Sequence, residues 1–110
     1  MKSNFVAFGG RYVVDMAYYK SEISNSITGG RQKGNEIQKD LKQALGSGVP
    51  LILNFSGVDI VSNCLLDEAL CKLGIENITD FGKKISFIGC SDFVRMSIKA
   101  AIKDAYGSFI

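Results

Sequence analysis

LILNFSGVDIVSNCLLDEALCKL, residues 51–73, is the stretch that decides the fold of this chain. Its first residues, Leu51–Phe55, form an almost continuous apolar run, which is typical of a central strand buried on both faces. Residues 56–61 then supply a polar turn and a short crossover. Ser62 and Asn63 offer N-cap side chains for a helix that continues to the end of the stretch. We therefore expect a strand, a turn and a helix here.

The remaining elements follow outward from this stretch. Before it we expect strands over 4–8 and 11–19 joined by Gly9-Gly10, a loop over 20–30 and an amphipathic helix over 31–45. After it we expect a connector over 74–82, a strand over 84–89, and a helix from Ser91 or Asp92 to Ala105 that Gly107 closes. The predicted fold is therefore α/β, a single domain over 1–110 with a mixed four-stranded sheet, about three helices and the order β-β-α-β-α-β-α.

Composition and charge argue against several classes of protein. The 110 residues include 13 Lys and Arg against 11 Asp and Glu, a net charge of +2, and the basic residues are scattered, which is not a nucleic-acid footprint. No apolar run approaches the roughly 18–20 residues of a membrane span, and no signal peptide is recognisable. We therefore expect a cytoplasmic protein that binds neither nucleic acid nor membrane.

The chemistry of the side chains points away from metal and cofactor sites. Histidine is absent, and the three cysteines show no Cys-x-x-Cys spacing, so we expect no metal site, no cofactor and no histidine-dependent catalytic triad. Cys64 is expected at a helix start, where the helix dipole lowers a thiol pKa, which leaves a cysteine-nucleophile enzyme as one open alternative. A buried, unreactive cysteine is the other reading, and we expect no catalytic residues.

Polar residues gather where the central strand is expected to end. Asn54, Ser56, Asp59, Ser62 and Asn63 fall at the carboxyl end of that strand and at the start of the next helix, where open α/β sheets place their ligands. The alternative is that these residues only shape the turn and cap the helix.

Two further groups of charged residues are candidates. Asp67 and Glu68 lie early in the second helix, and consecutive helix positions point about 100° apart, which suits a partner-facing or structural role better than acid–base chemistry. Gly29-Gly30-Arg31-Gln32-Lys33-Gly34 imitates a phosphate-binding loop, although Asn35 and Glu36 replace the lysine and hydroxyl of a P-loop. A small-molecule or nucleotide-binding domain using this loop, with Arg31 and Lys33 as anion contacts, is the alternative function.

The motif over residues 53–66 resembles the signature of STAS domains, the fold of sulphate transporters and anti-sigma factor antagonists. That family reads as a strand ending in Asp-Leu-Ser, a short crossover to Asp-Ser-Ser-Gly-Leu, and a helix. The chain is similar above all to the STAS-like domains of uncharacterised bacterial proteins, which carry an Asp-Phe-x-x-Val strand end and an Asp-Glu pair. Asn54–Val58 and Asp67-Glu68 resemble these two features, and the expected order of elements agrees.

The resemblance implies a non-enzymatic regulatory module that binds a protein partner, such as a histidine-kinase-like ATPase. In anti-sigma factor antagonists that kinase phosphorylates a serine at the helix start, and the added charge breaks the interface. In this chain Cys64 stands at the phosphoserine position, Asn63 at the preceding serine and Ser62 at the aspartate, so Ser62 is the candidate acceptor. The implied partner-binding residues are Asn54, Ser56, Asp59, Ser62, Asn63, Cys64, Asp67 and Glu68.

Overall fold

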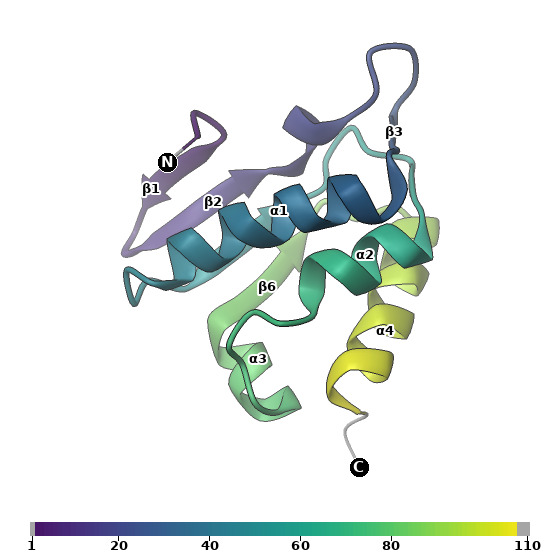
Figure 1. Ribbon diagram of the computed structural model, residues 1–110. Coiled ribbons are helices and arrows are strands. Elements are labelled where there is room, and N and C mark those ends of the chain that lie inside the picture. Colours follow the sequence, from purple (N-terminus) through teal and green to yellow (C-terminus); the bar gives the residue numbers. More distant parts are fainter. Residues whose placement is uncertain (1, 108–110) are drawn as a thin grey trace.

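The computed structural model describes residues 2–107 and contains a mixed sheet of four strands (Figure 1). The strands lie in the order β1 (Phe5–Phe8), β2 (Arg11–Asp15), β4 (Leu51–Asn54) and β6 (Ile85–Ile88). β1 is antiparallel to β2, and β2, β4 and β6 are mutually parallel. The predicted α/β class, the mixed four-stranded sheet and the antiparallel edge hairpin are thereby confirmed.

Helices cover one face of this sheet. α1 (Gly30–Leu45) packs against α2 (Asn63–Leu70), and α2 packs in turn against α4 (Asp92–Tyr106) (Figure 1). Alternate strand residues, Val14, Leu51 and Leu53 among them, point toward these helices and are fully buried. The described residues form four α-helices where about three helices were predicted, because α3 (Ile78–Lys84) forms within the expected connector.

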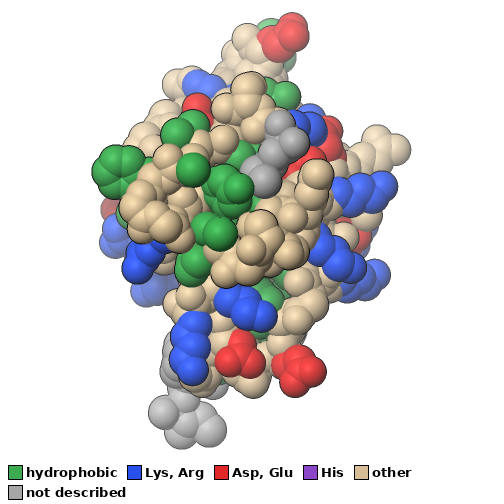
Figure 2. Space-filling view, turned by 90° about the vertical axis from the view of Figure 1, so that its left-hand side faces the viewer, with side chains coloured by type: hydrophobic (Ala, Val, Ile, Leu, Met, Phe, Trp, Pro, Cys, Tyr) green, Lys and Arg blue, Asp and Glu red, His purple; other side chains and the backbone are tan. Residues whose placement is uncertain are grey.

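The other face of the sheet has no helix over it among the described residues. β4 alternates between buried and half-buried positions, so the prediction of a strand buried on both faces is wrong. Cross-strand neighbours Val6, Val13 and Ile52 lie on this open face, and Val6 and Ile88 are about half exposed. Figure 2 shows hydrophobic side chains gathered on the side of the molecule where β1 and β2 lie.

Local hydrogen bonds end the second strand earlier than predicted. The Asp15 carboxylate accepts from the backbone N–H of Ala17 at 3.1 Å and starts a 3₁₀ helix, η1 (Met16–Tyr19), where the strand was expected to continue. The expected loop over 20–30 contains β3 (Ser26–Ile27). This strand pairs in parallel with β5 (Ile60–Val61), which lies within the expected crossover.

The region after α2 also differs from the prediction. The helix ends at Leu70 rather than continuing to residue 73, because Cys71 is extended and Lys72 has a left-handed φ of 53°. α3 then begins where the Asn77 side chain accepts from the N–H of Asp80 at 2.9 Å, a side-chain cap that the connector prediction overlooked.

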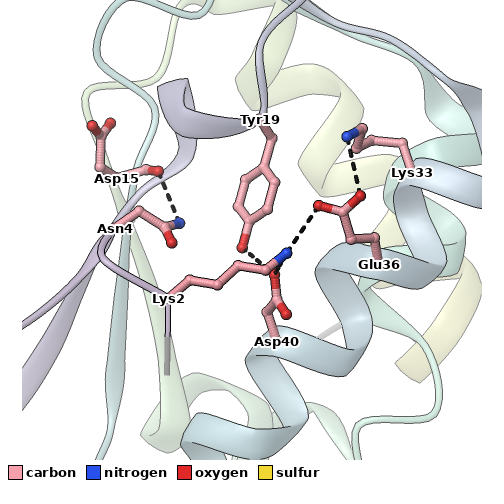
Figure 3. A network of polar contacts seen from close by, with 7 residues as sticks. All are labelled: Lys2, Asn4, Asp15, Tyr19, Lys33, Glu36 and Asp40. Atoms are coloured by element: carbon pink, nitrogen blue, oxygen red, sulfur yellow. Dashed lines mark hydrogen bonds and ion pairs between the residues drawn. The ribbon is translucent and has the colours of Figure 1, made fainter.

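A polar network ties the N-terminal segment and η1 to α1 (Figure 3). The Tyr19 hydroxyl donates to Asp40 at 2.7 Å, and Lys2 forms ion pairs with Asp40 at 2.9 Å and with Glu36 at 3.1 Å. The bond to Asp40 raises the pKa of Lys2, the bond to Lys2 lowers the pKa of Glu36, and burial raises the pKa of Tyr19. Lys33 also pairs with Glu36, so both carboxylates are neutralised by neighbouring cations.

α1 and α2 lie in close contact at Gly34. This residue is buried inside α1, and a Cβ atom at its position would lie 2.5 Å from the Leu65 carbonyl oxygen and 2.8 Å from Glu68 Cβ. Since real Cβ atoms do not approach neighbours so closely, the hydrogen of glycine is what allows α2 to pack at this depth.

Gly34→Ala is expected to destabilise the protein, although alanine is the better helix former. Overpacking of this kind costs about 1–3 kcal/mol, more than the 0.5–1 kcal/mol that alanine contributes in a helix interior. Gly82→Ala is the matched control, because Gly82 is an exposed residue of α3 and a Cβ there would meet nothing within 4 Å. Chemical denaturation should show opposite signs for the two variants; stabilisation by Gly34→Ala would contradict the close approach.

Candidate functional site

α1, α2 and α4 all begin on the side of the molecule where the parallel strands end (Figure 1). Ser91 is the N-cap of α4, and its hydroxyl accepts from the N–H of Val94 at 3.1 Å. The same hydroxyl donates to the carbonyl of Asp59 at 2.9 Å. One side chain therefore caps α4 and holds the start of this helix beside β5.

The start of α2 is exposed and has no side-chain cap. Ser62 occupies the N-cap position, but its hydroxyl lies 3.7 Å from the Cys64 sulfur and accepts no hydrogen bond from the helix backbone. Ser62, Asn63 and Cys64 are all exposed. These side chains thus lie in solvent at the positive end of the helix dipole, which favours negative charge.

Large apolar side chains are exposed on the neighbouring elements. Ile60 of β5 is 51% exposed, and Phe93 and Met96, one turn apart on α4, are each 70% exposed. α4 packs against β5, and the Ser91–Asp59 hydrogen bond brings Phe93 close to this strand. We call the set Ile60, Ser62, Asn63, Cys64, Phe93 and Met96 the α2 N-terminal surface.

Asn54 and Ser56 also lie at the edge of the sheet where the parallel strands end, but they belong to the turn after β4 and not to the α2 N-terminal surface. The side-chain amide oxygen of Asn54 accepts from the N–H of Ser56 at 3.0 Å and closes the turn after β4. Asn54 is paired with Ile88 in the sheet and shares its open face. A Cβ at Gly89 would lie 2.8 Å from Asn54 Oδ1, so this turn is packed tightly against the end of β6.

The two basic residues predicted as anion contacts both form ion pairs with carboxylates. Glu68 forms an ion pair with Arg31 at 3.6 Å, and Lys33 is paired with Glu36. Arg31, Asp67 and Glu68 line a shallow hollow of about 260 Å³ that also contacts Asp104. Both cations expected to bind an anion near Gly29-Gly30 therefore already have carboxylate partners.

The carboxyl end of α2 is held by side chains from two other helices. The Gln38 side-chain amide of α1 donates to the carbonyls of Cys71 at 2.7 Å and of Glu68 at 3.3 Å. The Tyr106 hydroxyl of α4 donates to the carbonyl of Leu70. These bonds satisfy the carbonyls that a helix leaves unpaired at its end, so α2 is fixed at one end and open to solvent at the other.

The thiols differ in their surroundings. Cys64 is exposed, whereas Cys71 is half-buried and donates to the carbonyl of Glu68 at 3.4 Å. Burial raises the pKa of the Cys90 thiol.

Within residues 2–107 no group of three or more His, Cys, Asp or Glu side chains could hold a metal ion. In the same range no helix is long and apolar enough to cross a bilayer.

The structure thus divides the residues predicted from sequence into three groups. Ser62, Asn63 and Cys64 start α2, Asn54 and Ser56 shape the turn after β4, and the Asp67-Glu68 pair lies on α2 beside Arg31. Asp59 lies between the first two groups along the chain, and its backbone bonds to Asn25 and Ser91 instead.

Sequence reasoning missed the apolar part of this surface. Phe93 and Met96 are three residues apart on the predicted last helix and lie off the stripe formed by Val94, Ile98 and Ala101. Apolar residues outside the core stripe of a predicted helix were therefore the available signal.

Comparison of the chain with models of protein families, with curated proteins and with solved structures finds no match.

Gln38→Met is expected to lower the free energy of unfolding by about 1–3 kcal/mol, because a thioether of similar length leaves buried carbonyls of α2 without a donor. Gln43→Met is the matched control, since Gln43 is exposed on the same helix and should change stability by less than about 0.5 kcal/mol. Urea denaturation measures both. Equal effects of the two substitutions would show that Gln38 does not hold the end of α2.

Alkaline pH is expected to destabilise the fold through Tyr106. Burial raises its pKa from 10.0 to about 12. Between these values the unfolded chain releases the phenol proton while the folded chain keeps it, so stability falls as pH rises from 10 toward 12. The unfolding free energy of Tyr106→Phe should fall less steeply across this window. An unchanged slope would contradict the raised pKa.

Proposed function

We propose that this chain is a non-enzymatic regulatory module that binds a protein partner through the α2 N-terminal surface. The observation that carries the proposal is the exposure of Ile60, Phe93 and Met96 beside the uncapped start of α2. Exposed apolar side chains that gather in one place, with a polar rim around them, are typical of protein interfaces.

The resemblance to STAS-like domains supports the same surface. In anti-sigma factor antagonists the residues that begin this helix carry the regulatory phosphate. Here the corresponding residues Ser62, Asn63 and Cys64 are exposed at the start of α2. A histidine-kinase-like ATPase is the partner that the resemblance favours, and a cytoplasmic location goes with it.

Ser62 is the proposed phosphoacceptor and switch of this surface. Ser62 is exposed, and within residues 2–107 the only hydrogen-bond partner of its hydroxyl is the Cys64 sulfur, so modification breaks no bond that holds the fold. A phosphate on Ser62 would carry about −1.5 to −2 charges at the positive end of the helix, which stabilises α2 itself. The same charge would oppose an apolar or acidic partner surface, so binding can change without unfolding.

The test is retention of a partner from the native host by the tagged chain and three variants. Phe93→Asp puts a charge into the apolar part of the surface, and Ser62→Asp imitates the phosphate while remaining a good N-cap. Phe8→Asp is the matched control, because Phe8 is 75% exposed on β1, at the far edge of the sheet. We expect an ATPase to be retained by the wild type and by Phe8→Asp, and at least tenfold less by the other two.

Circular dichroism and thermal unfolding of each variant show whether a lost interaction reflects lost structure. Ser62→Asp should melt at or slightly above the temperature of the wild type, because negative charge at a helix start stabilises by about 0.3–1 kcal/mol. Equal retention by all four proteins would exclude this surface, and retention of no protein by the wild type would count against the binding role itself.

A further inference from the structure

The outer edge of β6 has no strand beside it in the described part of the chain. β6 pairs only with β4, and the N–H of Phe55 donates to the carbonyl of Ile88. Because backbone groups alternate sides along a strand, Ile88 and Ser86 face β4 while Phe87 and Ile85 face outward. The Ile85 N–H is occupied by the carbonyl of Phe81. The N–H and C=O of Phe87 and the C=O of Ile85 thus point toward the open edge.

An apolar groove runs along this edge, between β6 and α4. Two adjoining hollows of about 440 and 450 Å³ share Phe87, Lys99 and Ile102 in their walls. Ile78, Phe81 and Ile85 complete the apolar floor of the first hollow. A strand added to β6 would direct every second side chain onto this floor, since side chains alternate between the faces of a sheet.

The charged wall of the groove is entirely basic. Arg95, Lys99 and Lys103 are spaced four residues apart along one side of α4, and they are the only charged residues that line the two hollows among the described residues. None of the three forms an ion pair within residues 2–107. The groove therefore complements an occupant that carries carboxylates.

We infer that β6 and α4 form a docking groove for an extended acidic peptide segment, which adds as a strand to the β6 edge. Main-chain hydrogen bonds to Phe87 and Ile85 hold the backbone of the segment. Among the alternate side chains that face α4, apolar ones fill the floor and acidic ones meet the basic row. This site goes beyond the α2 N-terminal surface and does not depend on it.

A second copy of the chain is a poor occupant of the same groove. Pairing β6 with β6 of another copy would extend the sheet and bring two α4 helices together on one face. Arg95, Lys99 and Lys103 of the two copies would then lie side by side, and like charges in such positions repel. Charge thus favours an acidic segment from another protein over self-association.

The probe is the blocked nine-residue peptide Val-Thr-Glu-Thr-Val-Thr-Glu-Thr-Val, whose Val and Glu side chains all lie on one face of the extended chain. It is compared by fluorescence anisotropy at low salt with its counterpart in which Lys replaces Glu. We expect saturable binding of the acidic peptide, at least tenfold weaker binding of the basic one, and weakening by added salt. Lys99→Glu/Lys103→Glu should raise the Kd at least tenfold. The exposed pair Lys39→Glu/Lys42→Glu on α1 is the charge-matched control and should leave the Kd within twofold.

Backbone methylation of the peptide distinguishes strand addition from simple charge attraction. In an extended peptide the backbone N–H groups of every second residue face β6, and those of the residues between them face away. Methylating the N–H groups that face β6 should abolish binding, while methylating those that face away should leave it intact. Equal loss with both sets, or with neither, would overturn the proposed geometry.

Protection of a thiol and the state of association complete the test. Cys90 lines the second hollow and Cys64 lies outside the groove, so bound peptide should slow alkylation of Cys90 and leave that of Cys64 unchanged. Association of the chain into a dimer that the acidic peptide fails to dissociate would overturn the inference, as would absence of peptide binding. Phe93→Asp should bind the peptide like the wild type, because Phe93 lies outside the groove. A negative result for the groove is therefore separable from a negative result for the α2 N-terminal surface.

Discussion

The packing of α2 against α1 is the contact on which the arrangement of the helices depends. α2 has only eight residues, fewer than the roughly 12–15 that an isolated helix needs to be even marginally stable in water. Its stability must therefore come from tertiary contacts. Gly34 lets α1 approach the backbone of α2, and Gln38, one turn further along α1, donates to the last carbonyls of that helix.

This dependence gives the two ends of α2 different properties. At the carboxyl end Gln38 and Tyr106 satisfy the backbone from inside the fold, so a change there affects stability. At the amino end Ser62 and Cys64 are exposed and make no bond on which the core depends. A charge at the amino end would leave the helix in place, because the opposite end is held from inside the fold, and this is the separation that the proposed switch requires.

The sequence was sufficient to predict the elements whose signals are periodic and local. Apolar residues at helical spacing predicted α1 and α4, and Gly9-Gly10 predicted the β1–β2 hairpin, all of which the structure contains. The short elements were missed because single side chains create them: Asp15 starts η1, and Asn77 caps α3. A strand pattern and a turn pattern compete over such short stretches, and one hydrogen bond decides between them.

The candidate site was predictable in part for the same reason. Position along the chain placed Ser62, Asn63 and Cys64 correctly at the start of α2, because N-cap signals are local. Sequence could not show that Arg31 is neutralised by Glu68, since that ion pair depends on how α1 crosses α2. Nor could it show that Ile52 is only half-buried, because an apolar run of five residues looks the same whether one face or two are covered.

α4 connects the two proposed binding surfaces through one rigid element. Its buried stripe of Val94, Ile98 and Ala101 holds it in the core, and this leaves Phe93 on one flank and the basic row on another. Structural coupling between two sites is usually carried by an element with two alternative arrangements. The Ser91 hydroxyl fixes the start of α4 to Asp59, and Tyr106 fixes its end to α2. A helix anchored at both ends has no second position to adopt, so the two surfaces should bind their partners independently.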